Sequence, residues 1–276
     1  MTKFFLIVAF FISIKAAGQE LYVYSEPASN MPAHSISTKL TGHFVTNDNI
    51  YRRLSQRYMP EIMFGFSKKV MVHISTTFAN MHTNNFRFES VSLYGKYRFL
   101  SRDNLHTHFR MAAFADASYT RVPFHYDEIS LMGDKSGVEA GLIATQLWHK
   151  FALSGTVSHT QVLDRSRNHK FIYVPERNYQ SVNYVLSGGY LLLPREYTNY
   201  KQLNVNFYTE FLAQQTLDRK SHYIDMAPAL QFIFNSNAKL NIGYRFQLSS
   251  NMNRMSKQSW LISFERTFLN ALKEKK

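Results

Sequence analysis

An imidazole and a hydroxyl stand two residues apart at His73 and Ser75, in a segment where apolar and polar residues alternate. Such alternation is typical of a β-strand, in which every second side chain points to the same face. A serine activated by a histidine is the nucleophile of many hydrolases when a third group orients the base. Because this spacing also occurs often by chance, we assign no catalytic residue. Hydrolysis by this pair is the least favoured of our hypotheses.

A second pair, His106 and His108, would place two imidazoles on one side of another strand. Histidine and methionine, of which the chain has 11 each, suit copper or zinc. No third histidine or carboxylate stands at a spacing that closes a site locally. We therefore predict no metal site and no cofactor, and we keep His106 and His108 only as weak metal candidates at a solvated rim.

The largest group of candidates consists of charged side chains at the polar positions of alternating segments. If those segments form one closed sheet, all of these side chains face its interior. Opposite charges there can pair with each other, whereas rings of one sign select ions. The signs in this group are balanced, which favours pairing over a selective channel. The candidates for lining and selectivity are Lys39, Arg57, Glu61, Lys96, Arg98, Arg110, Asp116, Glu139, Glu210, Asp225, Arg245 and Glu265.

Twelve alternating stretches supply the elements that would position these side chains. A tilted strand of about 9–11 residues crosses a bilayer, and only a closed barrel satisfies its backbone there. We predict an all-β fold, a single antiparallel up-and-down transmembrane β-barrel of about 12 strands, with roughly 10–14 as the range. The expected strands lie near 35–45, 57–67, 70–78, 88–100, 106–121, 137–148, 151–161, 181–193, 202–211, 223–234, 239–249 and 259–269.

The connections between these stretches alternate in length, as expected for short periplasmic turns and longer outer loops. An even number of strands would place both ends of the barrel in the periplasm. A slip of one residue would turn a strand's charges toward lipid, so the register is tightly constrained. About twelve strands make a barrel wider than a filled eight-stranded one and narrower than an open porin. Both a narrow pore and a plugged lumen fit that width.

The N-terminus has the pattern of a secretory signal peptide: Lys3, an apolar run over 4–14 and small residues at 16–18. We expect cleavage after Gly18. Residues 19–33 would then form an irregular segment in the periplasm or tucked into the lumen, residues 34–269 the barrel, and residues 270–276 a tail. The chain has no cysteine, which excludes disulfides and thiolate metal sites.

The net charge of +13 comes from scattered basic residues, a distribution that does not favour nucleic-acid binding. One basic and aromatic stretch, within 162–180, is a candidate surface loop for binding a polyanion. Contact with the phosphates of lipopolysaccharide is the interpretation we prefer, and we predict no nucleic-acid partner. The surface-loop candidates are Arg165, Arg167, Lys170, Tyr173 and Arg177.

Three segments carry a family resemblance: LYVYSEPASNMPA at 21–33, HFRMAAF at 108–114 and GLIATQLWHK at 141–150. Together they resemble a family of uncharacterised outer-membrane β-barrel proteins of about this length in Gram-negative bacteria. The resemblance covers nearly the whole mature chain. It implies the fold and the location, and it brings no activity or functional residue with it.

Three functions follow as hypotheses. The first is a narrow passive channel or transporter for small solutes in the outer membrane. The second is a plugged structural or adhesive barrel that binds a surface ligand or lipopolysaccharide through its outer loops, and the third is a lipid-modifying enzyme. In each case we expect export by the signal peptide, insertion by the barrel-assembly machinery and contact with outer-membrane lipids.

Overall fold

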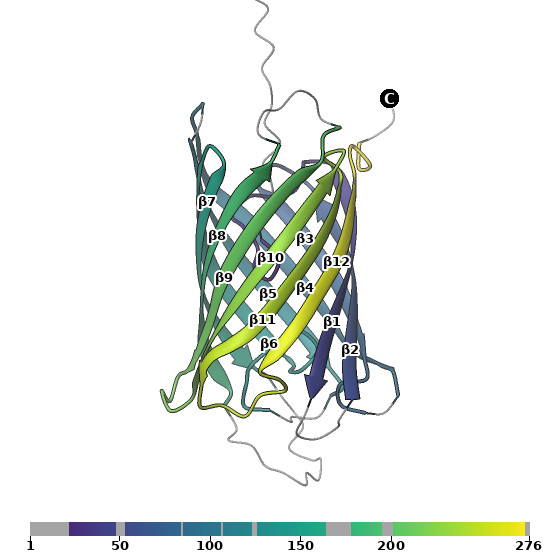
Figure 1. Ribbon diagram of the computed structural model, residues 1–276, viewed down its shortest axis with the longest axis vertical. Coiled ribbons are helices and arrows are strands. Elements are labelled where there is room, and N and C mark those ends of the chain that lie inside the picture. Colours follow the sequence, from purple (N-terminus) through teal and green to yellow (C-terminus); the bar gives the residue numbers. More distant parts are fainter. Residues whose placement is uncertain are drawn as a thin grey trace, which may run out of the picture.

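The protein is a closed β-barrel in which each strand pairs with the next in sequence and β12 closes on β1 (Figure 1). The computed structural model describes residues 22–47, 53–83, 85–105, 107–122, 126–163, 178–194 and 201–273. All pairings are antiparallel. The predicted fold class and the predicted number of strands are therefore confirmed. Within the described ranges there is no helix with the length and apolar character needed to cross a membrane.

The strands are 10 to 17 residues long. They are β1 (Ser35–Asn47), β2 (Arg53–Gly65), β3 (Val70–Ala79), β4 (Arg87–Asp103), β5 (Thr107–Thr120), β6 (Gly137–Trp148), β7 (Phe151–Val162), β8 (Gln180–Leu193), β9 (Asn204–Thr216), β10 (His222–Phe234), β11 (Ala238–Ser250) and β12 (Gln258–Phe268). Several extend a few residues past the predicted bounds, because the ladder of backbone hydrogen bonds continues beyond the apolar alternation. Two are displaced: β2 lies earlier than the predicted 57–67, and β9 lies later than the predicted 202–211.

The two faces of each strand differ as the alternation predicts, and β9 shows the difference clearly. Asn206, Tyr208 and Glu210 are 0% exposed, whereas Phe207 and Phe211 between and beside them are 43% and 40% exposed. A soluble protein rarely leaves a continuous band of large apolar side chains on its surface, whereas a transmembrane barrel presents one to lipid. The outer surface is therefore that of a membrane-spanning barrel, and the polar face lines its lumen.

The two ends of the barrel differ in their connections. β1 begins and β12 finishes at the same end, the upper one in Figure 1, which also carries the short turns 149–150 and 235–237. We call this the turn end. The opposite loop end carries the longer connections, among them 121–136 and 251–257. The predicted asymmetry between short turns and long loops is thus present.

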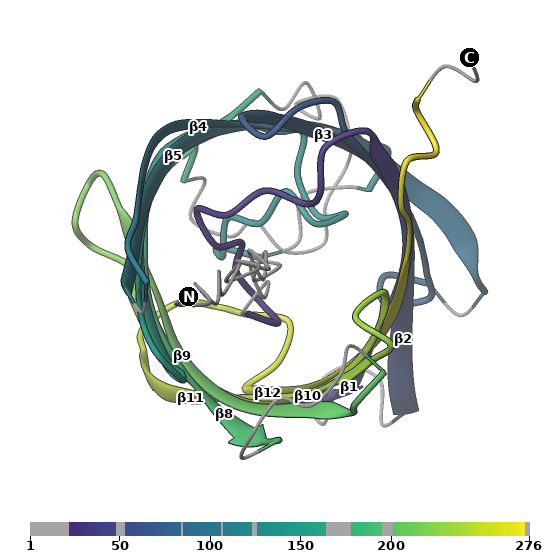
Figure 2. The same ribbon diagram turned by 90° about the horizontal axis from the view of Figure 1, so that it is seen from above.

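The lumen is occupied by chain from both ends. Figure 2, viewed along the barrel, shows a purple stretch before β1 and a yellow loop between β11 and β12 inside the ring of strands. The stretch comprises residues 22–33, which we call the lumenal segment. From the loop end, residues 126–136 and 251–257 fold inward, and we call these the outer loops. Three irregular segments thus lie inside the barrel, next to its polar wall.

A charge on the lipid-facing surface tests the assignment of the two faces. Phe211→Arg places a guanidinium near the middle of β9 on the exposed face, where we expect a loss of about 2–4 kcal/mol in the free energy of unfolding. Leu269→Arg, just beyond β12 at the turn end, is the control, with an expected loss of about 0–1 kcal/mol. Denaturant titration in lipid vesicles measures both. Equal losses at the two positions would contradict this assignment.

Candidate functional site

Glu210 on β9 anchors the lumenal segment. Its Oε1 accepts hydrogen bonds from the backbone N–H groups of Val23 (2.9 Å) and Tyr24 (2.8 Å). Its Oε2 accepts one from the Ser25 hydroxyl at 2.6 Å and one from Ser187 on β8 at 3.2 Å. A carboxylate offers about four lone-pair sites, so this buried side chain is fully used. Three of its four partners belong to the segment.

Lys96 on β4 is a second anchor, and all three of its ammonium protons point to the lumenal segment. It donates to Oε2 of Glu26 at 3.1 Å and to the carbonyl oxygens of Pro27 (2.8 Å) and Ser29 (2.9 Å). Lys96 is buried, so its charge depends on these partners. Outside strand ladders, buried backbone groups must find other partners, and in this segment the barrel wall provides them.

Apolar contacts also hold the lumenal segment against the barrel wall. The Tyr22 ring meets the Tyr208 ring edge-on at 5.8 Å. Tyr24 packs over Gly243 on β11, where a Cβ atom would come within 2.9 Å of the tyrosine ring and would force the ring to shift. Near the turn end, Met31 clusters with two wall methionines, Met63 and Met71. The segment is thus held by apolar as well as polar contacts.

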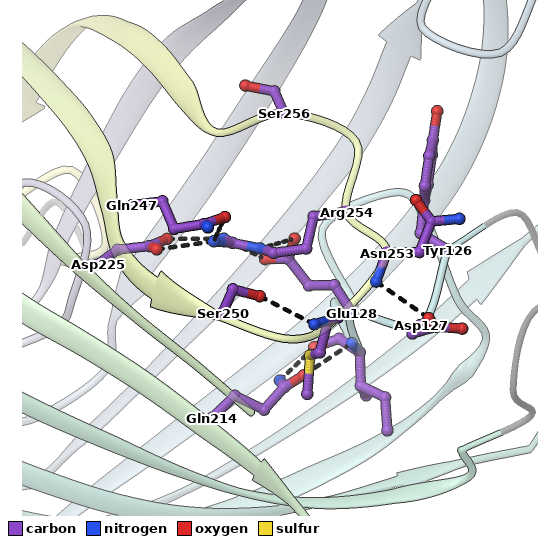
Figure 3. A network of polar contacts seen from close by, with 12 residues as sticks. Tyr126, Asp127, Glu128, Gln214, Asp225, Gln247, Ser250, Asn253, Arg254 and Ser256 are labelled. Atoms are coloured by element: carbon purple, nitrogen blue, oxygen red, sulfur yellow. Dashed lines mark hydrogen bonds and ion pairs between the residues drawn. The ribbon is translucent and has the colours of Figure 1, made fainter. Parts of the chain in front are cut away.

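Arg254, at the loop end, joins the outer loops to the wall (Figure 3). Its guanidinium binds Asp225 of β10 through two nitrogens, at 2.7 and 2.6 Å, and binds Glu128 of the other outer loop at 2.9 and 3.2 Å. It also lies 4.0 Å above the Tyr223 ring. Arg245 adds a bond to the same aspartate at 2.6 Å. Planar, bidentate pairing of this kind is the strong form of the arginine–carboxylate bond.

Backbone contacts hold the same loops together. The N–H of Asp127 donates to the carbonyl of Asn253 at 3.0 Å, and the N–H of Asn253 donates to Asp127 Oδ2 at 3.0 Å (Figure 3). Gln214 on β9 accepts from the N–H of Ile129 at 2.9 Å and donates to its carbonyl at 2.7 Å. The two outer loops therefore form one layer that is fixed to the wall by side chains.

A bulge in β4 creates a second ionic group. Thr77 pairs with Ser90 and Phe78 with Phe88, so Glu89 is the extra residue and its buried carboxylate turns into the lumen. It lies 3.5 Å from Nη2 of Arg57 and 3.0 Å from Nδ1 of His82. The terminal nitrogens of Arg57 also bind Asp134 of the outer loop.

A pocket of about 630 Å³, including its open mouth, lies between the outer loops and the inner faces of β1, β2, β11 and β12. Val45, Arg57 and Met81 among its lining residues are buried, while Met132, Lys257 and Gln258 are exposed. The exposed members place the mouth at the loop end. His43 also lines the pocket and meets the Tyr24 ring edge-on at 6.4 Å. One lining residue of the pocket thus contacts the lumenal segment.

The twelve predicted lumen residues all lie on strand faces that point inward, but in separate groups. Lys39 pairs across the strands with Glu61 and Glu265, and Lys239, which we did not predict, lies 3.4 Å from Glu265. Asp116 and Glu139 are opposite each other on β5 and β6. Arg110 binds Asp103 at 2.9 Å and Ser29 of the lumenal segment at 2.9 Å.

The remaining candidates fall as follows. Arg98 lies opposite buried Ala112, which places it on the lumen face. Five more candidates hold the lumenal segment or the outer loops through the contacts described above: Arg57, Lys96, Glu210, Asp225 and Arg245. That any of the twelve selects a solute stays a prediction. Their observed partners are mostly residues of opposite charge or backbone of the lumenal segment.

Two of the histidine candidates, His73 and His108, lie beside carboxylates. His73 Nδ1 lies 3.0 Å from Glu61, and Ser75 bonds to Ser92 at 2.6 Å. His108 Nδ1 lies 2.8 Å from Asp103, near the turn end. Within the described ranges no group of three or more His, Cys, Asp or Glu side chains is arranged to hold a metal ion. His106 and the surface-loop candidates Arg165, Arg167, Lys170, Tyr173 and Arg177 lie outside the described residues.

Sequence reasoning missed the residues that bring the segments together. Glu26, Glu128, Asp134 and Arg254 lie in irregular segments, where no period shows which way a side chain points. Glu89 lies at a bulge, which breaks the period. One feature of the sequence could have indicated them. A buried charge such as Lys96 or Asp225 in a closed lumen requires a residue of opposite charge nearby.

Acid should loosen the outer loops only below the ordinary pKa of their carboxyl groups. Burial by itself raises the pKa of Glu128, but Arg254 and Arg245 outweigh it and hold that pKa below its usual 4.5. In the same way Arg57 outweighs burial and lowers the pKa of Asp134 below 3.8. The stabilisation from a lowered pKa is complete above the unfolded-state value and is lost as pH falls through the folded-state value.

We therefore expect constant amide-exchange protection of residues 126–136 from neutral pH down to about pH 5 and a loss well below pH 4.5. Hydrogen exchange corrected for its intrinsic pH dependence measures this, and strand β6 is the internal control. Loss of protection between pH 7 and pH 5 would contradict the arginine–carboxylate account of the outer loops.

The barrel is similar in fold to solved structures of outer-membrane β-barrels. The chain is similar to an outer-membrane channel from Pseudomonas putida F1, with a TM-score of 0.55 and 10% identity over 90% of this chain and 100% of that one. It also matches the KdgM porin, with a TM-score of 0.49 and 9% identity over 84% of this chain and 99% of that one. The chain has the fold of an outer-membrane β-barrel. No protein-family model and no curated protein matches it.

Proposed function

We propose that the protein is an outer-membrane channel whose lumen is closed at rest by residues 22–33, and that small hydrophilic or amphipathic solutes pass when this segment leaves. One observation carries the proposal. Within the described residues the segment has no strand partner, yet five of its backbone groups bond to Glu210, Lys96 and Thr145, all side chains of the lumen wall. A wall built in this way holds an extended peptide in a defined place.

The segment suits a removable gate better than a permanent core. The hydrogen-bond ladder of the barrel closes through β1 and β12 without it. Its polar contacts are hydrogen bonds and one ion pair, which water can replace when the segment leaves. The charged side chains left behind would then line a hydrated lumen, and their balanced signs would favour weak ion selectivity.

The fold supports a channel in the outer membrane, where barrels of this kind have short turns on the periplasmic side. In that orientation the lumenal segment enters from the periplasm and the outer loops and pocket face the outside. Export by a signal peptide at 1–18, insertion by the barrel-assembly machinery and contact of the outer loops with lipopolysaccharide belong to the same proposal.

A second candidate is the plugged structural or adhesive barrel. The inward fold of the outer loops, together with the lumenal segment, favours it, because chain then enters the lumen from both ends. The two candidates differ in one measurable property. A gated channel conducts when the segment is released, whereas a structural barrel stays closed or loses its fold.

Solute uptake by proteoliposomes separates the two candidates. Residues 22–31 are replaced by a glycine–serine linker of the same length, and heat-modifiable migration on gels verifies a folded barrel. We expect slow swelling with the unaltered protein in small sugars and amino acids, and rapid swelling with the variant. A folded variant that swells no faster than the unaltered protein would reject the gated channel in favour of the plugged barrel.

A further inference from the structure

We propose that the pocket at the loop end binds an amphipathic carboxylate. The carboxylate would lie at His43 and Arg57, and the apolar chain would follow a wall of methionines toward the mouth. The site stands whether or not the barrel conducts, because binding is measured on the closed protein. The ligand of this pocket need not be a solute that passes through the channel.

The first observation is the apolar wall. Met59, Met81, Met132 and Met255 all line the pocket, although methionine is a minor residue of this chain. Met81 and Met255 pack together with Val45. Methionine is unbranched and polarizable, and it adapts to apolar ligands of varied shape.

The second observation is a pair of unused polar atoms in the pocket lining. His43 and Arg57 are cross-strand partners on β1 and β2, so their side chains are neighbours on the lumen face. Within the part of the chain that the structure describes, neither His43 Nε2 nor Arg57 Nε has a hydrogen-bond partner, and both atoms are buried. A buried polar atom without a partner is costly. The arginine Nε–H can only donate, so an acceptor oxygen is the group that this corner lacks.

The charges around the pocket narrow the class of ligand. Arg245 and Arg254 already share Asp225 and Glu128, and the terminal nitrogens of Arg57 bind Asp134. A polyanion would therefore find few free cations, and a cation would find carboxylates that are already paired. A ligand with one small anionic group and an apolar remainder matches the groups that are left. The anionic group can bind His43 and Arg57, and the apolar part can contact the methionines.

Calorimetric titration of the protein in lipid nanodiscs tests the site, with octanoate as the probe and empty nanodiscs as the blank. We expect saturable binding of one octanoate, with affinity increasing by up to about fourfold for each methylene from hexanoate to octanoate. Uncharged 1-octanol should bind at least tenfold more weakly, and acetate should not bind. Equal binding of octanoate and octanol would overturn the carboxylate assignment.

Three variants locate the ligand. His43→Phe keeps the ring against Tyr24 but removes the nitrogen, and should weaken octanoate about tenfold to hundredfold without affecting octanol. His43→Gln restores a donor and should recover most of the affinity. Met255→Gln should weaken both probes, whereas Met252→Gln, in the same loop but outside the pocket lining, is the matched control. An unchanged octanoate affinity in folded His43→Phe, or equal losses in the two methionine variants, would refute the site.

Discussion

Glu210→Ala is expected to open the channel. The substitution leaves the N–H groups of Val23 and Tyr24 without their acceptor and takes a partner from Ser25. A hydrogen bond to a charged group contributes about 1.5–3 kcal/mol. Loss of two such bonds, about 3 kcal/mol or more, shifts the equilibrium between seated and released segment by a factor of about 100 or more. Single-channel recording in a planar bilayer should show a matching rise in open probability.

Glu265→Ala is the matched control for this variant. Glu265 is also a buried glutamate of the lumen wall, but it bonds to Ser37, Thr267 and Lys239 of the wall itself. Both substitutions remove one buried carboxylate, so a general weakening of the barrel would affect them alike. Equal conductance in the two variants would show that release of the lumenal segment is not what opens the lumen.

Arg254→Met is expected to detach the outer loops. Breaking a buried, hydrogen-bonded ion pair on one side costs about 3–5 kcal/mol, because the partners stay buried without compensation. Here Asp225 and Glu128 lose their bidentate partner and, among the described residues, keep Arg245 as their cationic partner. The population of the detached loop should rise about 100-fold or more. Trypsin cleavage after Lys257, an exposed residue of this loop, should become faster in proportion.

Two further variants make this result specific. Arg254→Lys keeps the charge but not the planar fork, so we expect an intermediate cleavage rate. Arg219→Met removes an exposed arginine from the β9–β10 turn at the same end of the barrel and should leave the rate unchanged. If Arg254→Met is cleaved no faster than Arg219→Met, the arginine does not hold the outer loops.

The sequence predicted the barrel well because its signal has a physical period. The Phe207 side chain faces lipid and that of its neighbour Tyr208 faces the lumen. Side chains alternate in this way, with a period of two residues, along each strand. The faces of all twelve strands follow from that rule once the register is set. At Glu89 one extra residue shifts the register, and the rule fails there.

The interior could not be predicted in the same way. The lumenal segment and the outer loops have no period, so their course depends on partners far away in the sequence. Glu128 and Arg254 are separated by more than a hundred residues, yet they lie within hydrogen-bond distance. The sequence left open whether residues 19–33 lie in the periplasm or in the lumen. The described part, residues 22–33, lies in the lumen because wall side chains replace its missing strand partners.

A reversible crosslink tests the gate most directly. The hydroxyls of Ser25 in the lumenal segment and Ser187 in the wall lie 3.1 Å apart, and the chain has no native cysteine. Ser25→Cys and Ser187→Cys, placed together in the Glu210→Ala background, should form a disulfide that fixes the segment in place. We predict a silent bilayer under oxidising conditions and discrete channel openings once a reductant is added. Conductance that is the same before and after reduction would contradict a gate formed by residues 22–33.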